Sequence, residues 1–308
     1  MVRRAVRFAL LASVFCFAGC TVEGGDDDDA GDDDDAGDDD DDGPSAEPAQ
    51  LAELSEGECP DLSTPGAKSF ESGGTTRDVL VYFPEDRPEN MPVVFLWHSL
   101  GSSAQTIAGW AGARDLADEQ EVIVVVPDSS GNFLMEWDYA GTGELDLAVF
   151  DDMRTCVVNE LGADVTRISA AGFSAGAVWT TSLSMHRATS LATVLPISGG
   201  LVTGLDYRTP GYRFPALLAS GGEGRDTWGA GALLQDFALA TDAFGEGLRE
   251  DGHLVVRCNH GGGHTPSSRI VTMLEEWLLP HRFGHPSPYA DGDLGDLPDD
   301  ECVVEDAE

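Results

Sequence analysis

The segment of residues 165–186 constrains the fold more than any other part of the chain. Residues 165–171 are rich in β-branched and small apolar side chains, as in a buried parallel strand. Gly172-Phe-Ser-Ala-Gly176 follows at once, and a run compatible with a helix begins behind it. In this context the turn is so sharp that larger side chains at the glycines would collide, and the serine becomes an exposed nucleophile. We therefore predict Ser174 as a nucleophile; a solvated serine in a glycine-rich turn is the alternative.

Strand and helix signals alternate on both sides of this turn. Continuous apolar runs predict strands at residues 78–83, 93–98, 121–127, 192–198, 215–220 and 253–258. Helical spacing occupies residues 105–120, 144–161, 230–250 and 267–279. This alternation predicts an α/β fold with a mostly parallel central sheet and helices on both faces. Active sites in such sheets lie outside the carboxyl ends of the strands.

A serine nucleophile at neutral pH needs a histidine base, and the base needs a carboxylate that fixes its tautomer. On a strand–turn–helix scaffold of this kind the chain order is serine, acid, histidine. The loop after the last predicted strand, Cys258-Asn-His-Gly-Gly-Gly-His-Thr-Pro266, offers two histidines behind the serine. We predict His264 as the base and keep His260 as the alternative.

The orienting carboxylate should follow the predicted strand at 215–220. The loop behind it contains Glu223 and Asp226, and Asp206 lies further away. We predict Asp226, because its greater distance from the strand lets it reach the histidine loop.

The oxyanion of an acyl-transfer intermediate needs two backbone N–H donors. One should come from Ala175, directly after the nucleophile at the helix start. The other should come from the loop that follows the strand ending at His98, and we assign it to Leu100. His98 itself is interpreted as a structural residue that braces this loop.

Three blocks of sequence resemble a known family. Trp97-His98-Ser-Leu-Gly101-Ser-Ser, Gly172-Phe-Ser-Ala-Gly176 and Gly261-Gly-Gly-His264-Thr-Pro266 are similar to the α/β-hydrolase branch of secreted poly(3-hydroxybutyrate) depolymerases and feruloyl or acetylxylan esterases. The resemblance covers roughly residues 66–280 and implies an α/β-hydrolase fold. It also implies ester hydrolysis through an acyl-enzyme on Ser174, without a cofactor. One departure is Ser99, which stands where the family usually has glycine.

The amino terminus predicts export. A basic start and a short apolar stretch are followed by Phe17-Ala-Gly-Cys20, which resembles a bacterial lipoprotein cleavage box. Residues 1–19 are therefore predicted as a lipoprotein signal peptide and Cys20 as the lipidated residue; a cleaved signal without lipid is the alternative. We expect a lipid-anchored protein of the cell envelope, most simply at the outer membrane, or a secreted one.

Three blocks of aspartate follow, at residues 26–29, 32–35 and 38–42. Residues 20–58 are predicted to be an extended disordered tether, because they contain too little apolar surface to fold. The catalytic domain is expected at 59–285 and an acidic, disordered tail at 286–308. The formal net charge of −39 disfavours nucleic acid and anionic lipid as partners, so membrane contact is expected only through the lipid.

Four cysteines remain outside the signal and the lipidation site. In an exported protein they predict disulfides, and their spacing fits no zinc site. We favour Cys156–Cys258 within the domain and Cys59–Cys302 joining its two ends, with the other pairings open. Spaced aspartates in the tail lack the full calcium-loop pattern, so no metal site is predicted.

Two other functions remain open at this stage. A surface binding protein that keeps the hydrolase scaffold but has lost its chemistry is one, and Ser99 favours it. A peptidase of the same fold is the other. Large aromatic residues near the predicted strand ends, Trp110, Trp137, Tyr139, Trp179 and Trp228, suit either substrate binding or the core.

Overall fold

The strands that were expected from apolar runs form one mixed sheet. The computed structural model describes residues 47–131, 136–140, 142–231 and 234–305. Nine strands lie in the order β1-β2-β4-β3-β5-β6-β7-β10-β11, and the six from β4 to β10 are parallel to one another. Their bounds are β1 Gly66–Ser72, β2 Thr75–Tyr82, β3 Val93–Trp97, β4 Ile123–Pro127, β5 Ile168–Phe173, β6 Thr193–Ile197, β7 Ala216–Ser220, β10 Val255–Asn259 and β11 Cys302–Glu305. The predicted α/β fold with a mostly parallel central sheet is confirmed.

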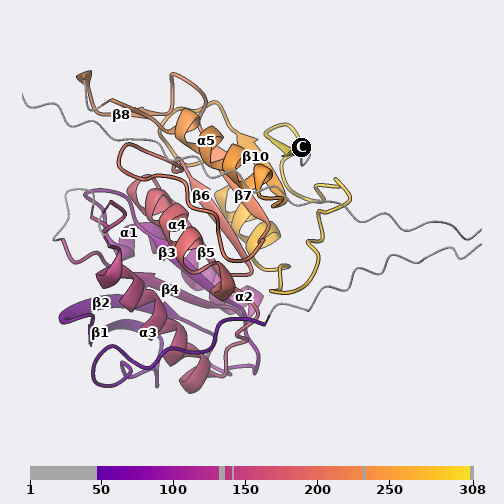
Figure 1. The fold of residues 1–308 in the computed structure, drawn as a ribbon. Helices are drawn as coiled ribbons and strands as arrows, with labels where there is room; N and C mark the ends of the chain where they lie inside the picture. The colour runs from indigo at the N-terminus through magenta and orange to yellow at the C-terminus, as the bar shows by residue number, and fades with distance from the viewer. Residues whose placement is uncertain (1–46, 132–135, 141, 232–233, 306–308) are drawn as a thin grey trace, which may run out of the picture. The chain divides into compact units, whose positions relative to one another are not determined.

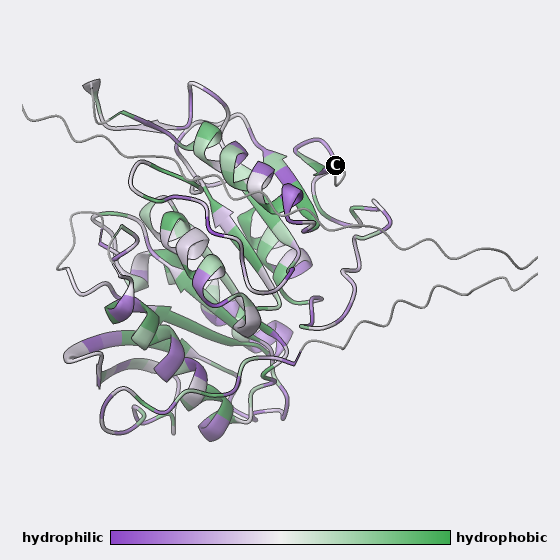
Figure 2. Cartoon of the chain, in the orientation of Figure 1, coloured by the Kyte–Doolittle hydropathy of each residue, from purple (hydrophilic) through white to green (hydrophobic). Residues whose placement is uncertain are grey.

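Helices cover both faces of this sheet (Figure 1). On one face lie α3 (Glu144–Leu161), α4 (Ala175–His186) and α5 (Phe237–Glu250); on the other lie α1 (Ala104–Trp110), α2 (Ala113–Gln120) and α6 (Ile270–Met273) with the π-helical turn Leu274–Leu278. A short 3-10 helix spans Ala188–Ser190. The central strands are mainly apolar, and β3 and β4 are so along their whole length, because both faces of the sheet are buried there (Figure 2).

Several boundaries differ from the predicted ones for local reasons. The helix expected at 105–120 is divided into α1 and α2, because Gly112 adopts a left-handed φ of 62° between them. The helix expected from residue 230 begins only at Phe237, and a short hairpin of β8 (Thr227–Trp228) and β9 (Gln235–Asp236) precedes it. The edge strands β1 and β11 were not predicted, since neither has the apolar run of a central strand.

The favoured disulfide pairing is wrong. The structure joins Cys59 to Cys156 and Cys258 to Cys302. Cys156 lies on α3, over the half of the sheet with β1 to β4, whereas Cys258 lies on β10 near the opposite edge. Cys302 pairs directly opposite Cys258 in the β10–β11 ladder, so the two sulfurs meet there. This local partner excludes a disulfide across the sheet.

Both ends of the described chain extend beyond the predicted domain boundaries. Residues 49–55 lie against α3, where the carbonyls of Ala49 and Gln50 accept hydrogen bonds from Arg154. At the other end, β11 continues the sheet beyond residue 285. These segments are ordered because backbone pairing and the disulfides compensate for their low apolar content.

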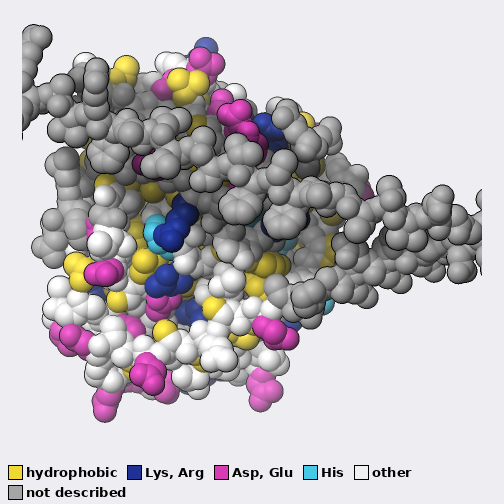
Figure 3. All heavy atoms as spheres, in the orientation of Figure 1, with side chains coloured by type: hydrophobic (Ala, Val, Ile, Leu, Met, Phe, Trp, Pro, Cys, Tyr) yellow, Lys and Arg dark blue, Asp and Glu magenta, His cyan; other side chains and the backbone are white. Residues whose placement is uncertain are grey.

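The signal peptide, Cys20 and most of the predicted tether lie outside the described residues. Among the residues that are described, no helix has the length and apolar character needed to cross a membrane. The visible face in Figure 3 shows acidic side chains around its periphery and a smaller group of basic ones near its middle.

Candidate active site

The nucleophile turn lies between β5 and α4. Ser174 has a φ of 56° and a ψ of −118°, a strained conformation for a residue with a side chain. A Cβ at Gly172 would lie 2.3 Å from the carbonyl oxygen of Gly176, and a Cβ at Gly176 would lie 2.0 Å from that of Trp97. Both glycines are therefore required by close backbone approach, as the sequence analysis predicts.

Three predicted side chains from distant loops converge at this turn. The Nε2 atom of His264 lies 2.9 Å from the Oγ of Ser174. The Nδ1 atom of the same ring lies 2.7 Å from Oδ1 of Asp226. Asp226 is fully buried and the His264 side chain is 16% exposed, so the relay is shielded from water on its acid side. The arrangement has the geometry of a serine, histidine and acid relay.

The Asp226 carboxylate is fixed by donors on its second oxygen. Oδ2 accepts one hydrogen bond from the backbone N–H of Gly221 and one from the hydroxyl of Ser198, each at 2.8 Å. Sequence reasoning did not assign Ser198 a role. Its position could have indicated such a role, because Ser198 ends the strand predicted at 192–198, and active sites form at the edge of the sheet where the parallel strands end.

The imidazole of His264 lies between two aromatic rings. Phe237 stacks on it at a centroid distance of 4.6 Å, and Phe173 does so at 5.1 Å. Phe237 begins α5, and its backbone N–H donates to the carbonyl of Asp226. The two rings restrict the rotation of the imidazole, a contact that sequence reasoning missed.

His98 braces the loop that follows β3. The backbone N–H of Ser129 donates to His98 Nε2 at 3.0 Å, so this nitrogen carries no proton. The proton is then on Nδ1, which donates to the carbonyl of Ser99 at 2.9 Å. The structural role predicted for His98 agrees with these contacts.

The same loop is held from its outer side by Glu136. One carboxylate oxygen accepts the backbone N–H of Gly101 and the other accepts the hydroxyl of Ser129. The Ser129 hydrogen bond, helped by that of Gly101, lowers the pKa of Glu136 below its usual value. A carboxylate that stays ionised keeps both hydrogen bonds charge-assisted.

The two predicted oxyanion donors belong to the start of α4 and to the loop after β3. Ala175 is the first residue of α4, where backbone N–H groups have no partner within the helix. Leu100 is half-buried in the loop braced by His98 and Glu136. Ser99, the departure from the family pattern, has no left-handed φ angle, so its side chain causes no backbone strain there.

A mainly apolar cavity of about 250 Å³ opens beside the relay. Ser99 and Ser102 of the loop after β3 line it together with Trp110 of α1, Phe173 and Pro266. Phe173 separates Trp110 from His264, because its ring contacts both. The cavity therefore lies next to the residue that packs on the base, and its apolar lining suits the apolar part of a small substrate.

The other candidates occupy different places. Trp137 and Trp179 are buried in the core around Trp97, Tyr139 packs at the edge of that core, and Trp228 is 45% exposed on the β8–β9 hairpin. Of the aromatic residues considered, only Trp110 reaches the cavity. Glu223 and Asp206 are exposed, and the Nδ1 atom of His260 accepts the N–H of Gly262 in its own loop, whereas His264 is the histidine at Ser174. The described residues also contain no group of His, Cys, Asp and Glu side chains that could hold a metal ion.

Solved structures share this architecture. Native pOPH covers 80% of this chain and 96% of its own, with a TM-score of 0.64 and 19% identity. A thermostable esterase covers 70% of this chain and 62% of its own at a TM-score of 0.55 and 20% identity. The chain has the α/β-hydrolase fold.

Sequence relatives add a chemical class to this hydrolase fold. Feruloyl esterase D of Neurospora crassa is 28% identical over 258 residues, 73% of this chain and 87% of that protein. The bifunctional acetylxylan esterase/xylanase XynS20E of Neocallimastix patriciarum is 28% identical over 133 residues, 42% of this chain and 19% of that protein. No protein-family model matches the chain. Together the relatives and the fold support a carboxylic ester hydrolase.

Proposed function

We propose that the protein is a serine carboxylic-ester hydrolase that works through an acyl-enzyme on Ser174. The observation that carries the proposal is the continuous chain from Ser174 Oγ through His264 to Asp226, with contacts of 2.9 and 2.7 Å. The two esterase relatives agree with ester chemistry on this scaffold.

The relay assigns a role to each group. Ser174 Oγ attacks the ester carbonyl carbon while His264 Nε2 takes its proton, and Asp226 stabilises the imidazolium that forms. The backbone N–H groups of Ala175 and Leu100 stabilise the negative charge on the carbonyl oxygen. His264 then gives the proton to the leaving alcohol, and water repeats the sequence to release the acid.

The substrate belongs, in this proposal, to polyester or to feruloyl and acetyl esters of polysaccharides. The relatives are named for feruloyl and acetylxylan esters. The mainly apolar cavity near the relay, of about 250 Å³, would hold the apolar part of such an ester. An export signal with lipidation at Cys20 would place the enzyme in the cell envelope, near polymers outside the cytoplasm, and the two disulfides agree with an oxidising compartment.

The test is hydrolysis of short p-nitrophenyl esters by the native protein and by Ser174→Ala. We expect turnover that disappears in the variant while its circular dichroism spectrum stays unchanged. An organophosphonate probe should label Ser174 in the native protein alone. Equal turnover by both proteins would show that the site is elsewhere.

The same assays address the other two functions. Absence of both turnover and labelling would favour the binding protein, for which Ser99 beside the oxyanion loop is the supporting observation. Labelling together with cleavage of peptides, but not of esters, would favour the peptidase.

A further inference from the structure

The loop that carries His264 spans residues 260–269, between Asn259 at the end of β10 and α6. Its central part is fixed to the end of β7 and to the loop that contains Asp226. The N–H of His260 donates to the carbonyl of Ser220 at 3.1 Å, and the N–H of Gly263 donates to that of Gly221 at 3.0 Å. These bonds set where the loop crosses the sheet edge, but they do not fix its return to α6.

A short C-terminal segment, residues 300–302, contacts both ends of this loop. At the first end, the backbone N–H of Asn259 donates to the carbonyl of Glu301 at 2.7 Å. The disulfide between Cys258 and Cys302 lies one residue further. At the second end, the hydroxyl of Ser267 donates to Glu301 Oε2 at 3.2 Å.

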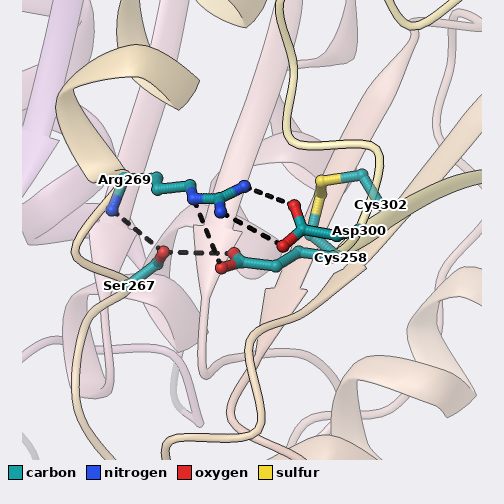
Figure 4. Close-up of a disulfide and its surroundings, with 6 residues drawn as sticks. Cys258, Ser267, Arg269, Asp300 and Cys302 are labelled. Carbon is teal, nitrogen blue, oxygen red and sulfur yellow. Dashed lines mark hydrogen bonds and ion pairs between the residues drawn. A yellow bond between two sulfur atoms is a disulfide. The ribbon is translucent and has the colours of Figure 1, made fainter.

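Arg269 completes the second attachment. Its guanidinium pairs with Asp300, and its Nε lies 3.7 Å from Glu301 Oε1. Figure 4 shows Ser267 and Arg269 facing the segment that carries Asp300 and the disulfide. Among the described residues, the hydrogen bonds and ion pairs that we find between residues 266–269 and distant parts of the chain all involve Asp300 or Glu301.

Several of the residues that attach the loop to the C-terminal segment are buried. Ser267 is 2% exposed, Cys258 3% and Cys302 6%. The Glu301 side chain is 16% exposed, whereas Asp300 is 62% exposed. Arg269 is 43% exposed, so solvent and salt screen both of its ion pairs, whereas the hydrogen bond from Ser267 to Glu301 joins two largely buried side chains.

We propose that Glu301, linked covalently through Cys302, is a positioning residue for His264. It sets the distance between the two ends of the histidine loop and thereby the approach of the imidazole to Ser174. A general base works only when it is held within hydrogen-bond reach of its proton, and small misplacements lower the rate steeply. The inference rests on the proposed function, because it assigns Glu301 a role only through that chemistry.

The test compares Glu301→Ala and Glu301→Gln in the full chain. Alanine removes the acceptor for Ser267 and the partner of Arg269, so we expect kcat for a short p-nitrophenyl ester to fall about tenfold, less than the roughly hundredfold loss for a 1 Å misplacement. KM should stay within about twofold, because the side chains that Glu301 contacts, Ser267 and Arg269, do not line the cavity. Glutamine keeps the acceptor and should retain at least about half of kcat.

The matched control is Glu305→Gln, at the end of the strand β11 that follows Glu301. Glu305 pairs with Arg249 and Arg257 and does not contact the histidine loop. Its substitution should leave kcat unchanged even where it lowers the unfolding temperature. The rate at which an organophosphonate labels Ser174 should follow kcat in all three variants, and this readout does not require the natural ester.

One result would overturn the role of Glu301 alone, and another would overturn the proposed function as well. If Ser174→Ala is inactive but Glu301→Ala keeps the native kcat and labelling rate, the positioning role is wrong and the proposed function stands. If the native protein neither hydrolyses the esters nor is labelled at Ser174, the proposed function fails, and the role of Glu301 fails with it.

Discussion

The two end segments of the described chain are attached by the same kind of bond but to different parts of the enzyme. The N-terminal segment lies along α3, where Asp152 accepts hydrogen bonds from Ser55 and the Cys59–Cys156 disulfide closes the contact. The C-terminal segment extends the sheet through β11, and its disulfide leads directly into the histidine loop. Among the described residues, the hydrogen bonds of the N-terminal segment lead mainly to α3 and not to the relay.

The difference shows that a disulfide takes its role from the element it ties. On α3 it holds a helix far from the reacting atoms, so its contribution is to stability. On β10 it holds one end of the loop that delivers the base. Stability and turnover should therefore respond separately when the two segments are altered.

The largest loss of kcat should come from a change in the relay itself. The C-terminal segment affects kcat only through the histidine of that relay. Asp226→Asn keeps the shape of the side chain but presents an amide to the N–H of Gly221 and the hydroxyl of Ser198. By analogy with the serine protease relay, kcat should fall by about 10⁴-fold, because the imidazole is held in the wrong tautomer. Steady-state kinetics on p-nitrophenyl esters measure this, and retention of a tenth of the native kcat would remove Asp226 from the relay.

Removing each disulfide in turn tests the difference between the two end segments most directly. Cys59 and Cys156 are separated by 97 residues, and Cys258 and Cys302 by 44. Chain-entropy arguments give losses of about 5 and about 4 kcal/mol in the free energy of unfolding when each pair is replaced by alanine. Urea unfolding should thus rank the N-terminal pair as the costlier.

Turnover should rank the same two variants in the opposite order. At a temperature where both are folded, the Cys258→Ala/Cys302→Ala protein should lose kcat and the Cys59→Ala/Cys156→Ala protein should keep it. Equal kcat values for the two variants would show that the C-terminal disulfide has no more influence on turnover than the N-terminal one.

A pH effect is expected beside the C-terminal segment. His281 hydrogen-bonds to the Trp277 carbonyl and to the hydroxyl of Ser287. Burial lowers the pKa of His281 from its ordinary value of 6.5 to about 4. Below pH 6.5 this histidine therefore binds a proton in the unfolded chain but stays neutral in the folded protein. The free energy of unfolding then decreases as the pH falls towards 4, by up to about 3 kcal/mol.

Urea unfolding at pH 7 and pH 5 measures this effect. His281→Gln removes the titrating group, so the variant should lose less stability than the native protein between these two pH values. Identical losses would contradict the buried, neutral histidine.

The smallest loss of stability is expected when the contact between the N-terminal segment and α3 is weakened. Asp152 is buried and accepts hydrogen bonds from the backbone and hydroxyl of Ser55 and from the hydroxyl of Ser72. Asp152→Ala leaves these donors unpaired and should lower the free energy of unfolding by about 2 kcal/mol. Its kcat should equal the native value; a loss comparable to that of Glu301→Ala would mean that both segments support the site.

The central strands and the nucleophile turn were predictable because their signals are local. Residues 168–186 combine an apolar strand, two glycines that permit close backbone contact and a following helix, all within one stretch of chain. The order of serine, acid and histidine followed from the topology of a parallel sheet. The edge strand β11 has no such local signal, since only four residues pair and half of its surface is solvated.

The α/β architecture and the candidates Ser174, Asp226 and His264 could be predicted from the amino-acid order alone, because hydrophobic period and turn chemistry act between neighbours along the chain. The cysteine pairing, the hydrogen bond from Ser198 to Asp226 and the contacts of Glu301 with both ends of the histidine loop became known only from the folded chain. These depend on which distant strands become neighbours and in what register, and that is decided by the packing of the whole sheet.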